Sequence, residues 1–145
     1  MKKKKIKVMC FGTFDLLHPG HLNYLKQAKK HGNYLIVVIA RDKTKKKQKK
    51  STLFNEKERL SLIQSLSLVD LAVLGSLHDP LQVIKKFNPD ILCLGYDQPL
   101  KISQLKEKLK ELNLFPKIKR LSSYRGYKYK STKLKQLLLS NIHKV

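Results

Sequence analysis

His18 and His21, three residues apart, are the side chains of this sequence best placed for chemistry. They stand in the stretch CFGTFDLLHPGH, between a short apolar run and residues of helical period. Pro19 and Gly20 suit the first turn of a helix, because proline lacks the N–H that stays unpaired there and glycine adds no bulk. Unpaired backbone donors and the positive end of a helix attract phosphate, and both imidazoles can add donors on one side. The spacing therefore predicts a phosphate-binding turn.

Other chemistry is poorly supported by the residues present. A pair of surface histidines without function is the plain alternative, and a zinc site is weaker, since structural zinc needs about four ligands and two are evident. The sequence has no convincing Ser-His-Asp set and no paired carboxylates. Cys10 and Cys93 each lie in an apolar run without CxxC spacing, which predicts reduced core residues.

Apolar runs of strand length alternate with segments of helical period along the chain. Strands are predicted at 6–11, 34–40, 69–74, 90–94 and 117–121, and helices at about 22–31, 55–66, 80–87, 103–112 and 131–142. The lysine-rich segment 41–52 is predicted to be an exposed, mobile loop, because its like charges repel one another. This order predicts a doubly wound, Rossmann-like α/β fold: a five-stranded parallel sheet with helices on both faces, in a single domain over 1–145.

The unusual polar clusters of the sequence all follow predicted strands. Parallel sheets of this class bind ligands beyond the carboxyl ends of their strands, where the winding reverses. The segments at that edge are GTFDLLHPGH, ARDKTKKK, LGYDQ and SSYRGYKYKSTK. We therefore expect one site built from all of them.

The charge of the chain points to anionic partners. There are 32 Lys and Arg against 10 Asp and Glu, a formal charge of +22. Phosphorylated small molecules, nucleic acid and anionic lipid all respond to such a field. Specific nucleic-acid reading is disfavoured, because the arginines that such recognition prefers are few. The chain lacks an apolar run long enough for a membrane span and a signal-peptide pattern, which predicts a cytoplasmic protein without a membrane partner.

GTFDLLHPGH resembles the signature of the HxGH nucleotidyltransferase superfamily, and the match is long, since GTFD precedes HxGH at the family's spacing. The resemblance implies that the motif contacts the nucleotide phosphates. Its residues in this chain are Thr13, Phe14, His18, Pro19, Gly20 and His21.

The rest of the chain is similar to the archaeal type of FAD synthase. ARD at 40–42, Arg59 within NEKER, LGYDQ and LNLFPKIKR carry this likeness. It implies an FMN adenylyltransferase that moves AMP from ATP to the phosphate of FMN, with Asp97, Tyr124 and Arg125 at the nucleotide. A glycerol-3-phosphate cytidylyltransferase, which would use CTP and an alcohol phosphate, is the alternative. Gly126 interrupts that family's RTxGISTTK motif, and Tyr127 stands where the archaeal synthases carry Cys, so the base and the acceptor stay open.

The implied reaction needs alignment and charge neutralisation rather than a general base, because an acceptor phosphate is already ionised at neutral pH. In this scheme His18 and His21 hold the α- and β-phosphates, and Ser131, Thr132 and Lys133 hold the leaving pyrophosphate. His18, His21 and Lys133 are the predicted catalytic residues. The predicted acceptor-binding residues are Asp42, Lys43, Lys45 and Arg59.

The resemblance also bears on cofactors and partners. A divalent ion, Mg²⁺, is expected to bind with the nucleotide rather than on protein ligands. Members of the family often dimerise, which implies a homodimer. A different class of function is a non-enzymatic RNA-binding module, since YRGYKYK at 124–130 interleaves aromatics with cations as single-strand binding platforms do.

Overall fold

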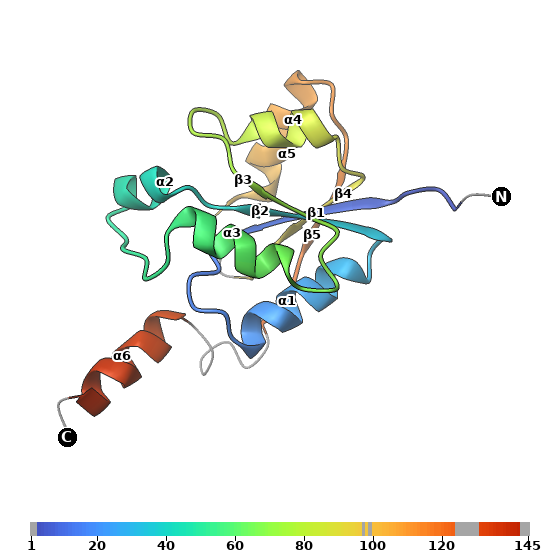
Figure 1. The fold of residues 1–145 in the computed structure, drawn as a ribbon. Helices are drawn as coiled ribbons and strands as arrows, with labels where there is room; N and C mark the ends of the chain where they lie inside the picture. The colour runs from blue at the N-terminus through green and yellow to red at the C-terminus, as the bar shows by residue number, and fades with distance from the viewer. Residues whose placement is uncertain (1–2, 97, 99, 124–130, 143–145) are drawn as a thin grey trace.

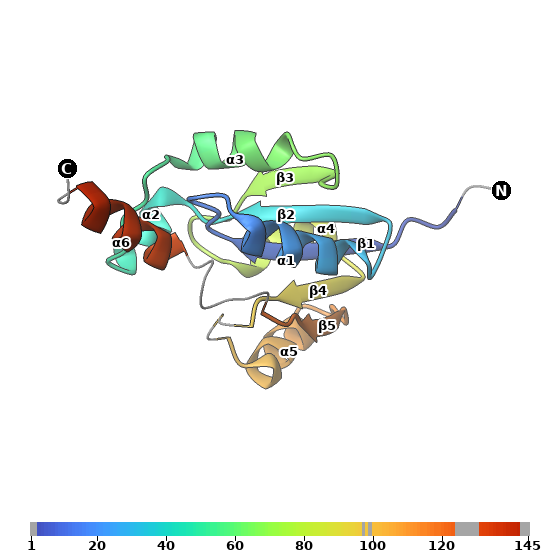
Figure 2. The same cartoon turned by 90° about the horizontal axis from the view of Figure 1, so that it is seen from below.

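Five parallel strands form the central sheet of the computed structural model, in the order β3-β2-β1-β4-β5 (Figures 1 and 2). The structure describes residues 3–96, 98, 100–123 and 131–142. The strands are β1 (Lys7–Gly12), β2 (Tyr34–Ile39), β3 (Leu71–Leu74), β4 (Ile91–Leu94) and β5 (Lys117–Arg120). The predicted α/β fold and its five strands are confirmed. Only β3 starts clearly late, because the amide of Val69 bonds to the carbonyl of Leu66 in a turn at 3.1 Å.

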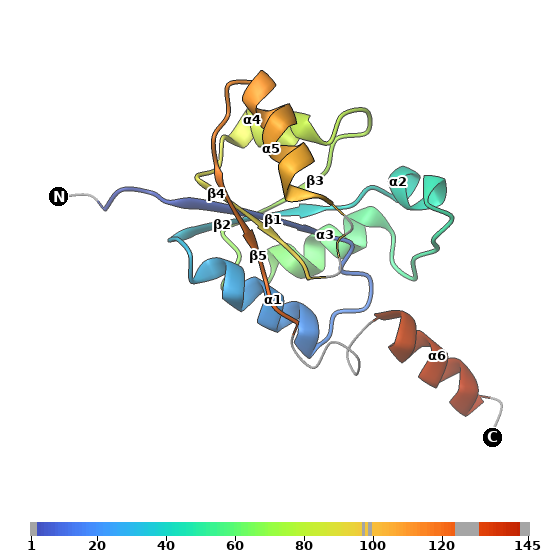
Figure 3. The same cartoon turned by 180° about the vertical axis from the view of Figure 1, so that it is seen from behind.

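Helices cover both faces of the sheet. In Figures 1 and 3, α1 and α3 lie against one face, and α4 and α5 lie against the other. The helices are α1 (Pro19–Lys29), α2 (Asp42–Lys47), α3 (Glu56–Gln64), α4 (Leu81–Phe87), α5 (Ile102–Glu111) and α6 (Ser131–Ile142). Asn55 and Glu58 form the predicted capping box at the start of α3. Among the helices of the described ranges, none has the length and apolar character needed to cross a membrane.

Alternate residues of the central strands feed two separate cores. Val8 and Cys10 of β1 point to the layer of α1 and α3, whereas Met9 points to the layer of α4 and α5. This double burial is the reason that the central strands are apolar throughout rather than alternating. Cys10 and its register partner Cys93 are buried free thiols, as predicted.

The prediction for 41–52 is wrong in its first half, where the chain forms the short helix α2. Asp42 explains the difference, because it stands in the first turn of α2, where a negatively charged carboxylate interacts favourably with the positive end of the helix dipole. Its Oδ2 also accepts a hydrogen bond from the amide of Glu56 at 3.0 Å, while the amide of Asp42 donates to Oε1 of Glu56 at 3.2 Å. This reciprocal pair fixes α2 to the start of α3 and outweighs the repulsion among the lysines.

The winding of the sheet reverses between β1 and β4, so the carboxyl ends of these two strands form the switch point at which such folds bind ligands. Tyr24 on α1 joins them: its hydroxyl oxygen lies 3.1 Å from the carbonyl oxygen of Phe11 and 3.3 Å from that of Cys93, so its one proton can bond to either strand. The ribbon places α2 and α6 beyond this same edge (Figure 2). Local structure thus gathers the predicted site segments around the end of β1.

Candidate functional site

His18 is the N-cap of α1. Its backbone is extended, with φ −145° and ψ 170°, and its Nδ1 accepts a hydrogen bond from the amide of Gly20 at 3.0 Å. A neutral imidazole that accepts at Nδ1 carries its proton on Nε2. The cap therefore fixes His18 as a donor through Nε2.

The predicted set of free backbone donors at this helix start is wrong in part. The Gly20 amide is taken by His18 Nδ1, and the His21 amide donates to the carbonyl of His18 at 3.0 Å. Capping satisfies donors that would otherwise stay unpaired. Anion binding at this turn consequently depends on the imidazoles and the helix dipole more than on those two amides.

The two imidazoles stack, with ring centroids 3.8 Å apart and an interplanar angle of 25°. Burial, together with the neighbouring His18, lowers the pKa of His21 to about 3. Burial also lowers the pKa of His18. Both rings are therefore neutral hydrogen-bonding groups at pH 7, rather than a pair of cations.

Phe14 packs against the ring of His21. Its side chain is buried, its φ is 52°, and its ring meets that of His21 edge to face at 5.3 Å. A Cβ on Gly12 would stand 2.5 Å from Phe14 Cε2, so only glycine leaves room for this turn. The ring of Phe14 thus positions a histidine and is not offered to a nucleotide.

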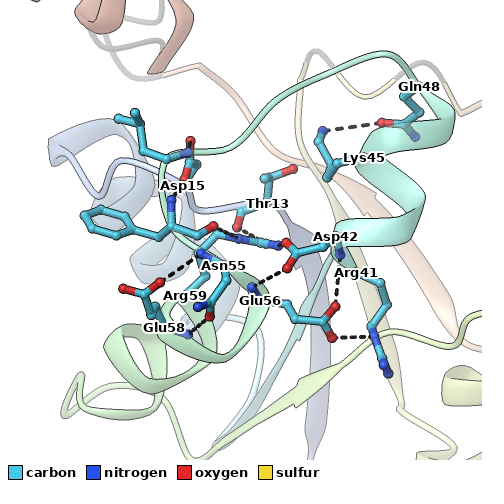
Figure 4. Close-up of polar contacts among 12 residues, drawn as sticks. Thr13, Asp15, Arg41, Asp42, Lys45, Gln48, Asn55, Glu56, Glu58 and Arg59 are labelled. Carbon is cyan, nitrogen blue, oxygen red and sulfur yellow. Dashed lines mark hydrogen bonds and ion pairs between the residues drawn. The ribbon is translucent and has the colours of Figure 1, made fainter.

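Arg59 holds the backbone of the same loop from inside the protein. Its side chain is fully buried, and it donates to the carbonyl of Thr13 at 2.9 Å, the carbonyl of Phe54 at 3.1 Å and Oδ1 of Asp42 at 2.7 Å (Figure 4). The predicted acceptor contact of Arg59 is not supported, because the guanidinium has no exposed surface. Asp42 pairs with Arg59 and with the Glu56 amide through its two carboxylate oxygens, although 33% of its side chain remains exposed.

Asp15 is the second buried charge at this loop. Its carboxylate accepts hydrogen bonds from the amides of Leu53 at 2.8 Å and Phe54 at 2.9 Å, and it pairs with the ammonium of Lys135 on α6. Burial alone would raise the pKa of Asp15, but the Lys135 ammonium and the two amides outweigh burial and hold the pKa below its usual value. Asp15 is therefore ionised and joins three segments of the chain.

The lysines predicted for the acceptor differ in placement. Lys43 is exposed on α2, whereas Lys45 is half-buried and borders a cavity of about 670 Å³ between α2 and the start of α3. Burial, Lys50 and Arg59 lower the pKa of Lys45. Lys46, Lys49 and Lys50 border the same cavity. The arrangement suits a phosphate group better than an apolar ligand.

The loop after β4, which carries LGYDQ, is fixed from two sides. Gln98 accepts from the amide of Gly95 at 2.9 Å and donates to the carbonyl of Phe11 at 3.0 Å. Arg120 on β5 donates to three carbonyls, those of Gly95 at 3.0 Å, Gln98 at 2.7 Å and Leu100 at 2.6 Å. The loop is thereby held beside the end of β1, although the predicted Asp97 itself lies outside the described residues.

The predicted phosphate-binding residues of the last helix stand in its first turn. Thr132 is exposed and Lys133 is half-buried, while the side chain of Ser131 is not described. Tyr124 and Arg125 lie outside the described residues, as does the whole segment 124–130 on which the RNA-binding alternative depends. Because Lys135 pairs with Asp15, this turn lies close to the histidine loop.

Four residues of this site were given no role from the sequence. Lys135 and Arg120 stand among many lysines, and nothing in the sequence distinguishes one of these cations from the others. Gln98 directly follows Asp97, the residue of the LGYDQ loop predicted to contact the nucleotide. Asp15 stood in the quoted motif without a role. Its place within GTFD, ahead of HxGH, is the sequence signal that could have drawn attention to it.

Comparison with known proteins shows the family to which the chain belongs. Residues 9–137 match the family model described as cytidylyltransferase-like. A protein of Thermoplasma volcanium named FAD synthase is 41% identical over 137 residues, which cover 94% of this chain and 96% of that protein. One of Picrophilus torridus with the same name is 42% identical, over 83% of this chain and 87% of its own.

Solved structures show the same fold. A Thermoplasma volcanium structure described as a lipopolysaccharide core biosynthesis protein has a TM-score of 0.82 and 44% identity, over 83% of this chain and 99% of that one. A pantoate-beta-alanine ligase from Francisella tularensis has a TM-score of 0.58 at 16% identity, over all of this chain and 72% of that one, and is similar in fold alone.

Proposed function

This chain belongs to the cytidylyltransferase-like family, and from that membership we propose how its histidine turn carries out nucleotidyl transfer. Relatives named FAD synthase match it over most of its length at about 40% identity. The chain is an FMN adenylyltransferase: it transfers AMP from ATP to FMN and releases FAD and pyrophosphate. This function accounts for the matches better than cytidylyl transfer to an alcohol phosphate or RNA binding does.

The chemistry requires a phosphate oxygen of FMN to attack the α-phosphorus of ATP. A new P–O bond forms as the bond from the α-phosphorus to the bridging oxygen of pyrophosphate breaks, and that oxygen keeps the electron pair. No proton has to be removed from the acceptor, so the protein must align the groups and stabilise the charge on their oxygens.

The histidine cap is the observation that carries this mechanism. The Gly20 amide occupies Nδ1 of His18, so Nε2–H faces away from the helix end as a fixed donor. His21 stacks on this ring and Phe14 supports His21. We assign the two imidazoles to the α- and β-phosphates. Because both are neutral in the free protein, the arriving phosphates would raise their pKa and strengthen these hydrogen bonds.

The remaining roles are divided between two cationic regions. Lys133, with Ser131 and Thr132, is assigned to the leaving pyrophosphate, since these residues begin a helix whose next turn is tied to the histidine loop. Lys45 is assigned to the phosphate of FMN, since it is half-buried at the cavity beside that loop. Arg59 acts through the loop backbone and does not contact a substrate, whereas Asp42 holds Arg59 and the start of α3 and lines the same cavity as Lys45. Lys43 is exposed on α2, and its ammonium is assigned to attract the acceptor rather than to contact it.

Enzymes of this type generally use a divalent metal ion. Among the described residues, no group of three His, Cys, Asp or Glu side chains could hold one. This scarcity of protein ligands is compatible with an ion that would be held mainly by the phosphate oxygens of ATP, as Mg²⁺ is in many nucleotide sites. When bound, such an ion neutralises charge on the phosphates. We propose Mg²⁺ in this role.

One assay tests the substrates. Purified protein is incubated with FMN or glycerol 3-phosphate, each with ATP or CTP and Mg²⁺, while pyrophosphate release and flavin chromatography are followed. FAD formed from ATP and FMN alone is the expected result. Formation of CDP-glycerol instead, or release of pyrophosphate in none of the four mixtures, would overturn the assignment.

A pair of variants tests the role of His18. Asparagine can still cap the Gly20 amide but lacks the distal donor, so His18→Asn should keep the thermal midpoint and lose about 10²- to 10³-fold in kcat. His18→Ala removes the cap as well and should lose both activity and about 1 kcal/mol of stability. If His18→Asn retains most of its turnover, the proposed donor role is wrong.

A further inference from the structure

Asp15 connects parts of the chain that are far apart in sequence. It lies in the loop between β1 and α1, holds the amides of Leu53 and Phe54 ahead of α3, and pairs with Lys135 on α6. Its side chain is 4% exposed and that of Lys135 is 27% exposed. A charge-assisted bond to a desolvated carboxylate is stronger than an ordinary surface ion pair.

Apolar packing does little to hold α6 in place. Its large apolar side chains are mostly open to solvent: 51% for Leu137, 56% for Leu138, 60% for Leu139 and 66% for Ile142. The ribbon shows α6 extending away from the sheet and its covering helices (Figures 1 and 3). The position of this helix therefore depends on polar contacts in its first turns, and the ion pair between Lys135 and Asp15 is one of them.

We propose that Lys135 is a positioning residue for nucleotidyl transfer: by its ion pair with Asp15 it seats the first turn of α6, which carries Thr132 and Lys133, beside the histidine loop. This inference rests on the proposed function and adds to it a residue with no contact to substrate. Lys135 lies one helical turn from Thr132, so fixing its side chain fixes the start of the helix.

The local charges give a second consequence of the pair. The ammonium groups of Lys45 and Lys135 are close enough to influence each other, and Asp15 is the carboxylate that faces both. Without Lys135, the buried Asp15 would keep its two amide hydrogen bonds but lose its paired ammonium, which leaves more negative charge beside the place assigned to the phosphates. Loss of Lys135 therefore both frees α6 and repels ATP.

Steady-state kinetics with ATP and FMN varied separately give the first test. Lys135→Met should lower kcat/KM for ATP by about tenfold or more, while the KM for FMN changes by less than about twofold. Lys135→Arg keeps the charge and should restore most of the loss. Lys108→Met removes the same charge from an exposed site on α5 and should behave like the unmodified protein.

A distance measurement tests the seating of α6 without depending on activity. Spin labels are attached to Ser61→Cys on α3 and Ser140→Cys on α6, both exposed positions. The native Cys10 and Cys93 are buried, and burial raises the pKa of Cys93 to about 11, so neither should react. Lys135→Met should broaden the distance distribution, and Lys135→Arg and Lys108→Met should leave it narrow.

The double variant separates seating from charge. Asp15→Asn with Lys135→Met removes both charges, so a purely electrostatic effect would recover, whereas a seating effect keeps the broad distribution and the poor use of ATP. The proposal is overturned if Lys135→Met leaves the distances unchanged, if it broadens them without affecting ATP, or if the double variant regains full activity. Should the unmodified protein make no FAD, the proposed function fails, and seating is then judged from the distances and from calorimetric binding of pyrophosphate to the same variants.

Discussion

Two buried charges and two neutral rings build the centre of this site. Arg59 donates to the backbone carbonyl of Thr13, and the carboxylate of Asp15 accepts from two amides ahead of α3. These bonds fix the loop that leads to His18 and His21, although neither charged side chain touches those rings. Buried charges are costly unless they are paired and hydrogen-bonded, and both are. Burial keeps the imidazoles of His18 and His21 neutral, so each ring has one N–H with which to donate a hydrogen bond.

His21 should make the stability of the protein depend on pH. The pKa of His21 is about 3 in the folded protein, below the usual 6.5. At pH values between the two, the unfolded chain binds a proton at this residue and the native state does not. Stability should therefore fall as the pH falls from 7 to 4, by about 2 kcal/mol from this residue, allowing for its partial exposure. The lowered pKa of Asp15 acts in the same direction, since the stability of that carboxylate is lost as pH drops through its usual and lowered values.

Denaturant unfolding at pH 7, 5.5 and 4 measures this effect in the unmodified protein and in His21→Asn. The variant lacks the titrating ring, so its unfolding free energy should depend less steeply on pH. Parallel pH dependences in the two proteins would show that the depressed pKa of His21 is absent.

Loops at the carboxyl edge are held by the strands next to them. The loop after β4 has the guanidinium of Arg120 on three of its carbonyls and the amide of Gln98 on the end of β1. Three hydrogen bonds from one planar cation define the path of a short loop more tightly than lysine could, because lysine has a single charged centre. The register between β4 and β5 thus determines where LGYDQ lies.

Substitution of Arg120 tests this arrangement. Arg120→Met should raise the KM for ATP by about five- to twentyfold, because it removes three charge-assisted hydrogen bonds from the loop predicted to contact the nucleotide. Arg120→Lys should recover only part of the loss. The exposed neighbour Lys119 has no hydrogen bond to the described residues of this loop, so Lys119→Met is the matched control in the same kinetic measurement. An unchanged KM in Arg120→Met would show that the loop holds its shape without the guanidinium.

The molecule as a whole carries a formal charge of +22, and both substrates are anions. A field of one sign raises the rate at which an oppositely charged ligand arrives, and salt screens it over about 10 Å at 0.1 M. Most lysines of this chain are therefore expected to attract the substrates at a distance, whereas Lys45 and Lys133 near the histidine loop are the ones proposed to contact them.

Ionic strength should accordingly act on encounter more than on chemistry. Raising NaCl from about 0.02 to 0.5 M should lower kcat/KM for ATP and FMN by about tenfold or more, with kcat changing little, because screening weakens the long-range field and not the hydrogen bonds of the bound state. Initial rates at constant free Mg²⁺ measure this. A kcat that falls as steeply as kcat/KM would place the salt effect in the chemical step instead.

Local patterns of the sequence were enough for the fold and for the central motif. The apolar runs of β1, β2 and β4, the capping box of α3, and Pro19 and Gly20 at the start of α1 each depend on neighbours within a few residues, so they are visible in the sequence. The order of alternating strands and helices then limits the sheet to a parallel one with its ligand edge at the carboxyl ends.

Only the tertiary structure decided which charged residues are structural. Arg59 lies 46 residues from Thr13 and Lys135 lies 120 residues from Asp15, and in sequence each is one cation among many. Burial and pairing depend on where the whole chain brings such side chains, and a helical period cannot distinguish a guanidinium turned inward from one in solvent. The same long-range pairing, between Asp42 and Glu56, made a helix of the lysine-rich segment that its composition predicted to be a loop.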